Sequence, residues 1–186
     1  RAVLRNTAFQ VARSRLADPR AAAGLEWFRD VSKMLLAPSM TETVAEAHFS
    51  PGDDCVRRVC GLFAGVRRSV DVCVFTITDD RIARAIYEAH KRGVNVRIIT
   101  DDEKAFDRGS DIEALNEAGV PVRLDNSPAH MHHKFAVFDH TLLLTGSFNW
   151  TRSASQENQE NIIVTSEPRL VQRFEQTFLE LWKTFG

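Results

Sequence analysis

The chain has 186 residues, of which 44% are hydrophobic and 26% charged, a composition typical of a folded globular domain and unlike that of a disordered or membrane-embedded chain. With 24 basic and 25 acidic residues the net charge is −1, so a polyanionic partner would need a local basic patch. The longest segment without a charged residue, 140–151, is far shorter than the roughly 20 apolar residues of a membrane-spanning helix.

The cysteine pattern bears on the cellular compartment. Cys55, Cys60 and Cys73 are an odd set with irregular spacing. In a chain long enough to bury an ordinary core, this favours reduced core thiols and a cytoplasmic location over a secreted disulfide framework. Because the first residue is Arg1, we expect the native start to lie upstream, and a removed signal or anchor stays open.

Residues 1–42 are predicted to form a helical extension. Apolar residues recur at helical spacing in 3–16 and 25–36, and Asp18-Pro19 is typical of an N-cap followed by a proline in the first turn. Basic residues outnumber acidic ones in this region. We expect two amphipathic helices, packed on the main domain and ending at the Pro38-Ser39 break. A basic arm that contacts nucleic acid or lipid headgroups is the alternative.

Residues 43–186 are predicted to form one α/β domain, a mixed and partly parallel β-sheet flanked by helices. Strand and helix patterns alternate with short connections, and no internal repeat is visible. The expected strands cover 44–49, 70–76, 94–100, 120–124, 132–138, 141–145 and 161–165, and the expected helices cover 53–66, 80–92, 110–118 and 167–185.

A group of polar residues in the second half of the domain carries the chemistry. His132 and Lys134 lie two residues apart in a predicted strand, so their side chains point to the same face and bring an imidazole and an ammonium together. Ser147 and Asn149 share a face in the same way, after a strand whose return brings them near His132. Gly146 permits a turn or a close approach of the backbone.

Asp139 has the opposite parity to His132, so we expect it to brace the end of the strand.

The complete spacing, His-x-Lys-x4-Asp followed by Gly-Ser-x-Asn, resembles the HKD signature of the phospholipase D superfamily. The segment 146–152 together with 158–161 is similar to the small single-motif branch, which contains bacterial Nuc-type endonucleases and mitochondrial Zucchini-like enzymes. This similarity covers about 47–185.

The resemblance implies a phosphodiesterase in which His132 attacks phosphorus and forms a phosphohistidine. Lys134 and Asn149 would hold the non-bridging phosphate oxygens, and Ser147 would add a hydrogen-bond donor. Glu160 would accept a proton from the other ring nitrogen of the histidine and fix its tautomer. No metal and no other cofactor is expected.

The same resemblance implies further site residues and a homodimer. Asp139 of the motif counts among the candidate catalytic residues, and Trp150 is a candidate substrate-binding residue beside Lys134, Ser147 and Asn149. The mechanism needs two histidines while the chain carries one motif, so a two-fold axis that juxtaposes two copies of His132 would complete the site. The basic residues expected to line a groove are Lys104, Arg108, Arg123 and Arg152.

Several functions remain in competition. The leading prediction is a metal-independent endonuclease that cuts single-stranded DNA or RNA, with duplex DNA as a further substrate. The runner-up is a phospholipase D-type hydrolase of cardiolipin or another phospholipid, so that a membrane lipid is the less favoured partner. A nucleic-acid-binding subunit of a larger defence or repair complex is the third alternative. A zinc site at His130, His132 and His133 is disfavoured because Lys134 would repel the cation.

Overall fold

The computed structural model describes residues 2–35 and 43–186, and the chain divides into two compact units, Arg1–Glu42 and Thr43–Gly186. The first unit contains the two predicted helices, α1 (Ala2–Ser14) and α2 (Pro19–Leu35). A carboxylate oxygen of Asp18 accepts a hydrogen bond from the Arg20 amide at 2.9 Å and so caps α2. The predicted Pro38-Ser39 break lies outside the described residues, and packing of the extension on the domain stays a prediction.

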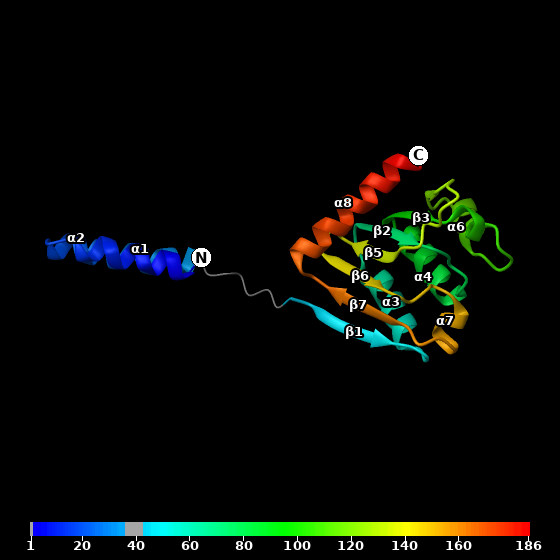
Figure 1. Ribbon diagram of the computed structural model, residues 1–186, viewed down its shortest axis with the longest axis horizontal. Coiled ribbons are helices and arrows are strands. Elements are labelled where there is room, and N and C mark those ends of the chain that lie inside the picture. Colours follow the sequence, from blue (N-terminus) through cyan, green and yellow to red (C-terminus); the bar gives the residue numbers. More distant parts are fainter. Residues whose placement is uncertain (1, 36–42) are drawn as a thin grey trace. The chain divides into compact units, whose positions relative to one another are not determined.

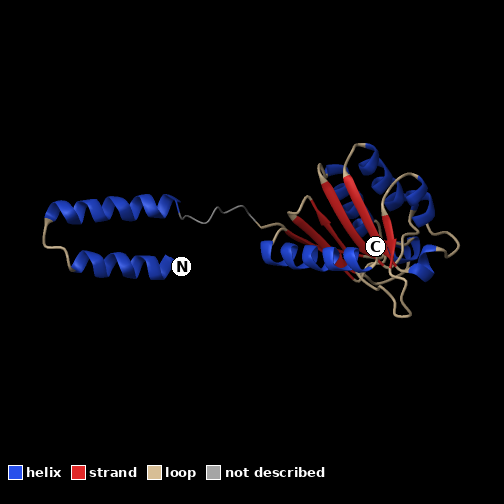
Figure 2. Ribbon diagram, turned by 90° about the horizontal axis from the view of Figure 1, so that it is seen from above, coloured by secondary structure: helices blue, strands red, loops and turns tan. Residues whose placement is uncertain are grey.

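The second unit is built on a seven-stranded mixed sheet with the strand order β1-β7-β6-β5-β2-β3-β4 (Figures 1 and 2). The pairs β2-β3 and β3-β4 are parallel, and the other neighbouring strands are antiparallel. The predicted α/β class with a mixed sheet is therefore confirmed. The strands are β1 (Ala45–Phe49), β2 (Ser69–Val74), β3 (Asn95–Thr100), β4 (Val122–Leu124), β5 (Lys134–Phe138), β6 (Leu142–Gly146) and β7 (Asn161–Thr165).

Helices cover both faces of this sheet. On one face, Val171 and Phe178 of the last helix pack on Phe135 and Leu143 of the sheet, and the larger core cluster fills the other face. Two short helices, α5 and α7, were not predicted, because four or five residues are too few to show a helical period. The helices of this unit are α3 (Asp54–Gly65), α4 (Asp80–Lys91), α5 (Asp102–Ala105), α6 (Ile112–Glu117), α7 (Arg152–Gln156) and α8 (Pro168–Thr184).

The three cysteines are free thiols in the part of the chain that the structure describes. Cys55 and Cys73 are buried and Cys60 is half-buried. Burial raises the pKa of the Cys55 thiol to about 11, so this thiol is protonated and unreactive at neutral pH. Among the described helices, none combines the length and hydropathy that a membrane-spanning segment requires.

Candidate active site

Two residues of the predicted motif, His132 and Lys134, lie where β2 ends and β5 begins. Val74, the last residue of β2, pairs with Lys134, the first residue of β5. Beyond the last ladder pair, the Phe75 amide donates a hydrogen bond to the His133 carbonyl oxygen at 3.0 Å. This antiparallel pairing holds Phe75 beside the segment that carries His132. A hollow of about 440 Å³, lined in part by His130 and His132, opens next to it.

His132 and Lys134 converge as the strand parity predicts. The Lys134 Nζ atom lies 3.1 Å from His132 Nδ1 and 3.3 Å from Nε2. It also donates a hydrogen bond to the His132 carbonyl oxygen at 2.9 Å. Both side chains pack on Phe75, with 4.5 Å between the imidazole and phenyl centroids and 5.3 Å from Nζ to the phenyl centroid. A buried ammonium and an exposed imidazole therefore lie side by side at this point.

The surroundings of His132 favour its neutral form. Burial and then the positive charge of Lys134 lower the pKa of His132 from its ordinary value. Burial also lowers the pKa of Lys134, and the nearby Glu160 carboxylate acts in the opposite direction. At neutral pH the imidazole keeps a free lone pair, which a nucleophile needs, next to an ammonium that can bind a phosphate oxygen.

Asn149 follows β6, and Glu160 directly precedes β7. The Asn149 Oδ1 atom is buried and has no hydrogen-bond partner among the described residues. A Glu160 carboxylate oxygen accepts a hydrogen bond from Asn158 Nδ2 at 3.3 Å. No hydrogen bond of the described residues joins Glu160 to His132, so the predicted role of this carboxylate in fixing the histidine tautomer stays a proposal.

Ser147 contacts β7. Its Oγ atom accepts hydrogen bonds from the Asn161 amide at 3.1 Å and from Asn161 Nδ2 at 3.5 Å. The Ser147 and Phe148 amides both donate to the Asn161 carbonyl oxygen. The hydroxyl proton of Ser147 is still available for donation. The main role that these contacts give the side chain is to connect the end of β6 to β7.

Gly146 is needed because the backbone of β7 comes very close. A Cβ atom at this position would lie 2.1 Å from the Asn161 carbonyl oxygen and 2.8 Å from the Ile162 Cα atom.

We expect Gly146→Ala to lower the free energy of unfolding by about 3 kcal/mol, because backbone atoms must shift to make room. Urea unfolding measures this change. Gly61→Ala is the matched control, since nothing lies within 4 Å of a Cβ atom there, and equal stabilities of the two variants would contradict the close approach.

Asp139 lies at the other end of β5 from the motif histidine. Its carboxylate oxygens accept hydrogen bonds from the backbone amides of Arg67, Arg68 and Ser69 at 3.0, 2.7 and 3.0 Å. Its φ of 49° places it in the left-handed region, where it closes the turn between β5 and β6. The expectation that Asp139 braces the strand end is thus confirmed. The prediction that Asp139 is also catalytic does not fit this position, because the whole of β5 separates its carboxylate from His132.

Trp150 does not line the site. Its side chain is fully buried, and its ring packs edge-on against Phe63 at a centroid distance of 5.9 Å. Its carbonyl oxygen accepts hydrogen bonds from the Thr78 and Asp79 amides. The prediction of a substrate-binding Trp150 is wrong, because a fully enclosed side chain cannot reach a substrate. From the sequence alone, a tryptophan within a polar motif can either pack in the core or contact a substrate, and no local pattern distinguishes the two roles.

Three of the four basic residues expected to line a groove are engaged within the chain. Lys104 Nζ lies 2.7 Å from an Asp107 carboxylate oxygen, and the Arg152 guanidinium lies 2.5 Å from Asp80. Arg123 stacks on the Trp182 ring of α8 at 4.2 Å. Two of these charges have carboxylate partners and the third stacks on an aromatic ring, so a nucleic-acid backbone would have to compete with these contacts.

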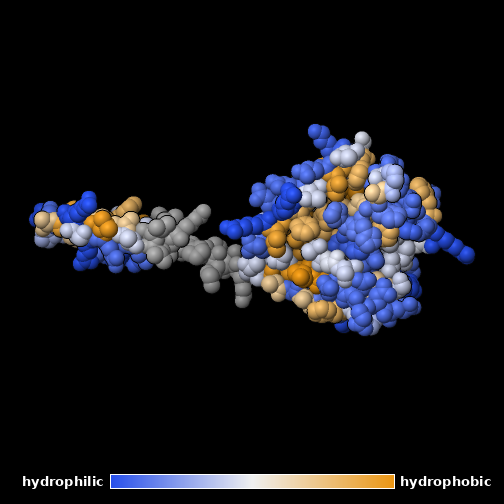
Figure 3. All heavy atoms as spheres, in the orientation of Figure 1, coloured by the Kyte–Doolittle hydropathy of each residue, from blue (hydrophilic) through white to orange (hydrophobic). Residues whose placement is uncertain are grey.

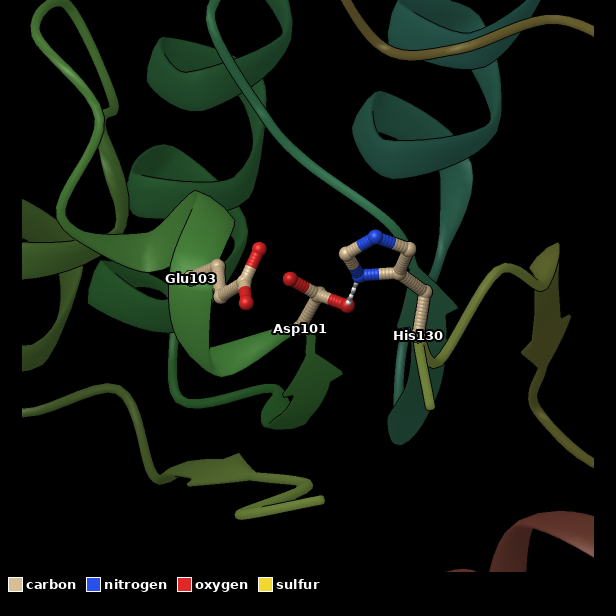
Figure 4. Close-up of side chains that lie close together, drawn as sticks. All are labelled: Asp101, Glu103 and His130. Atoms are coloured by element: carbon tan, nitrogen blue, oxygen red, sulfur yellow. Dashed lines mark hydrogen bonds and ion pairs between the residues drawn. The ribbon is translucent and has the colours of Figure 1, made fainter. Parts of the chain in front are cut away.

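His130 belongs to a different cluster from the one predicted. Its Nδ1 atom lies 2.9 Å from a carboxylate oxygen of Asp101, and the Glu103 carboxylate is close to both (Figure 4). His132 and His133 do not join this set among the described residues. The three histidines therefore do not form the alternative zinc site, and the hydrogen bond to Asp101 accounts for the position of His130.

Sequence reasoning missed three residues that surround the motif. Phe75 packs against His130, His132 and Lys134. Asp101 and Asp125 are both buried. A usable signal was present for the two acids, because each directly follows a predicted strand, and the carboxyl ends of parallel strands share one edge of a sheet.

Residues 59–182 match the protein family described as cardiolipin synthase, PLD-like domain. Two curated relatives named mitochondrial cardiolipin hydrolase come from Chlamydomonas reinhardtii, 52% identical over 63% of this chain, and Xenopus tropicalis, 45% identical over 72%. The matched part spans 53% and 63% of the length of these relatives. Among solved structures, the phospholipase D family member Nuc from Salmonella typhimurium superposes with a TM-score of 0.71 at 29% identity, covering 77% of this chain and 96% of that one.

Proposed function

The chain belongs to the phospholipase D-like family, and on that premise we propose that it is a metal-independent phosphodiesterase whose nucleophile is His132. The observation that carries this proposal is the contact between His132 and Lys134, with 3.1 Å between Nδ1 and Nζ in a partly desolvated site. A neutral imidazole next to a fixed ammonium suits attack on a phosphodiester, because the cation stabilises the negative charge on the phosphate oxygens.

The reaction would take place in two steps. A ring nitrogen of His132 attacks phosphorus, the bond from phosphorus to the leaving oxygen breaks, and a phosphohistidine forms while an acid protonates the leaving alcohol. Water then attacks phosphorus and gives a proton to the group that had acted as the acid, the P–N bond breaks, and the imidazole of His132 is released. Lys134 and the Asn149 side chain bind the non-bridging oxygens in both steps. No charge from a metal is needed in this scheme, because Lys134 supplies positive charge at that position.

The acid comes from a second copy of the chain in this proposal. One chain supplies one His132, whereas attack and leaving-group protonation need two imidazoles on opposite sides of phosphorus. A two-fold axis brings the same residue of both subunits to one point, so a homodimer supplies the missing imidazole without a second motif. Two Lys134 side chains would then flank the same phosphate.

We place phospholipid of the cardiolipin type first among the candidate substrates. The identity of 52% to a relative named mitochondrial cardiolipin hydrolase supports this order, as does the engagement of three expected groove cations within the chain. Phe106, directly after α5, exposes 75% of its surface. The visible face of the second unit also carries hydrophobic areas between hydrophilic ones (Figure 3).

Single-stranded DNA or RNA is the second candidate, which reverses the order predicted from the sequence. The resemblance of the motif to Nuc-type endonucleases and the structural similarity to Nuc support it. The chemistry at phosphorus is the same for both substrates, and only the leaving alcohol differs. We keep the cytoplasmic location as a proposal, supported by the three free thiols.

One assay tests the mechanism and ranks the substrates. The protein is incubated in excess EDTA with cardiolipin vesicles, single-stranded RNA, single-stranded DNA and duplex DNA, beside a His132→Ala control that detects contaminating enzymes. We expect cleavage to persist in EDTA and to be fastest on cardiolipin. Faster cleavage of a nucleic acid would establish the second candidate. Binding of nucleic acid without cleavage would favour the predicted role as a subunit of a larger complex, and strict dependence on an added divalent metal would contradict the mechanism.

A further inference from the structure

The segment that carries His132 has no regular secondary structure of its own. Residues 130–133 precede β5 and are neither helix nor strand. A nucleophile on such a segment needs other contacts to hold it, because attack in line with the leaving group requires a narrow range of positions. On its C-terminal side the segment is held by β5 and by the hydrogen bond from Phe75 to His133.

On the N-terminal side, the buried carboxylate of Asp125 holds the residue next to the nucleophile. Its Oδ2 atom accepts a hydrogen bond from the Met131 amide at 2.9 Å, and its Oδ1 atom accepts one from the Asp102 amide at 3.0 Å. Asp125 is 4% exposed, so water competes little for these bonds. The Met131 side chain is itself buried against the Cys73 sulfur atom. One carboxylate thus joins the segment to the start of α5.

A second carboxylate holds the residue before Met131. Asp101 is fully buried, and its Oδ1 atom accepts a hydrogen bond from the Lys104 amide at 3.1 Å. Its Oδ2 atom accepts from His130 Nδ1 at 2.9 Å, and Figure 4 shows the imidazole turned toward the carboxylate. The His130 ring also packs against Phe75 at 5.5 Å, on which the His132 ring packs as well.

We infer that Asp101, Asp125 and His130 are positioning residues for the nucleophile, an inference that rests on the proposed function. The two acids follow neighbouring strands, β3 and β4, and they fix two consecutive residues, His130 and Met131, directly before His132. Together with Phe75 they hold the imidazole of His132 against Lys134. The role of His130 is to connect the segment to Asp101 through its ring N–H group.

Two substitutions of His130 separate this role from others. His130→Phe keeps a ring for packing on Phe75 but removes the donor to Asp101, whereas His130→Asn keeps an amide N–H near the position of Nδ1. With bis(p-nitrophenyl) phosphate in EDTA, we expect His130→Phe to lower kcat by about 10-fold to 100-fold with KM nearly unchanged. We expect His130→Asn to recover most of kcat, and the pH profile to keep its shape in both variants.

The outcomes discriminate between explanations. Equal loss in both variants with a changed pH profile would overturn the inference, because His130 would then transfer a proton itself. Normal kcat in His130→Phe would overturn it as well.

A second readout does not depend on activity. The amides of Met131 and His132 should exchange hydrogen faster in His130→Phe than in His130→Asn, as measured by NMR. Unchanged exchange in both would refute the inference even if the wild-type protein proved inactive, which by itself would refute only the proposed function.

Discussion

Replacement of His132 by alanine is expected to reduce phosphodiester turnover by at least about 10⁴-fold, the order of loss seen when a covalent nucleophile is removed. The fold should persist, because the His132 side chain contacts mainly Phe75 and Lys134 at the beginning of β5, outside the hydrophobic core. The measurement is the single-turnover rate on a soluble diester, with the thermal midpoint recorded for the same preparation. Residual turnover within about 10-fold of the wild type would show that another group attacks phosphorus.

Asp139→Ala is the matched control, since it removes a polar residue of the same motif from the far end of β5. Three backbone amides lose their acceptor, so we expect a loss of roughly 1–3 kcal/mol in stability with much of the activity kept at low temperature. His132→Ala should show the opposite pattern. Equal thermal losses in the two variants would contradict the separation between a chemical role and a bracing role.

Most of the fold could be predicted from the sequence, because its elements are long enough to show their period. The strand patterns of 70–76 and 94–100 predict β2 and β3, and the amphipathic pattern of 167–185 predicts α8. The predicted ends of the elements were less accurate than their positions in the chain. The strand expected at 132–138 begins at Lys134, and the segment before it is held by Asp125, which accepts a hydrogen bond from the Met131 amide.

The site could be predicted only where spacing along one strand decides the geometry. The spacing of His132 and Lys134 correctly predicted their convergence, although His132 lies just before the strand, and the glycine at 146 correctly predicted a close approach of the backbone. Trp150 was misassigned because local sequence does not report tertiary burial. The contact of His130 with Asp101 joins residues 29 positions apart, which no local pattern encodes.

The pairing of charges also changes how the basic residues are interpreted. In the sequence Lys104 and Arg152 are simply cations, and a basic groove is a natural inference from them. In the folded chain each has a carboxylate partner, while Lys134 is buried and contacts His132 directly. This pairing supports the proposed order of substrates, because a cation that already has a carboxylate partner binds a polyanionic backbone less strongly than a free one.

A mixture of intact and inactive chains tests whether the site is shared between subunits. If His132 of one subunit attacks and His132 of the other protonates the leaving oxygen, a dimer with one His132→Ala chain has no complete site. Activity per total chain should then follow the square of the intact fraction. After denaturation and joint refolding with a ninefold excess of His132→Ala chains, about one hundredth of the wild-type rate should remain, against about one tenth if each chain works alone.

The two subunit types carry different tags, so that capture of mixed dimers verifies random pairing before the rates are compared. The same mixture made with Asp139→Ala chains controls for loss of protein during refolding, because that variant keeps its His132 and should lower the rate far less. A linear fall with the mutant fraction, or full activity in a monomer isolated by size-exclusion chromatography, would refute the shared site. The acid would then have to come from the same chain, and His130, which packs on the same Phe75 ring as the nucleophile, would be the first residue to test.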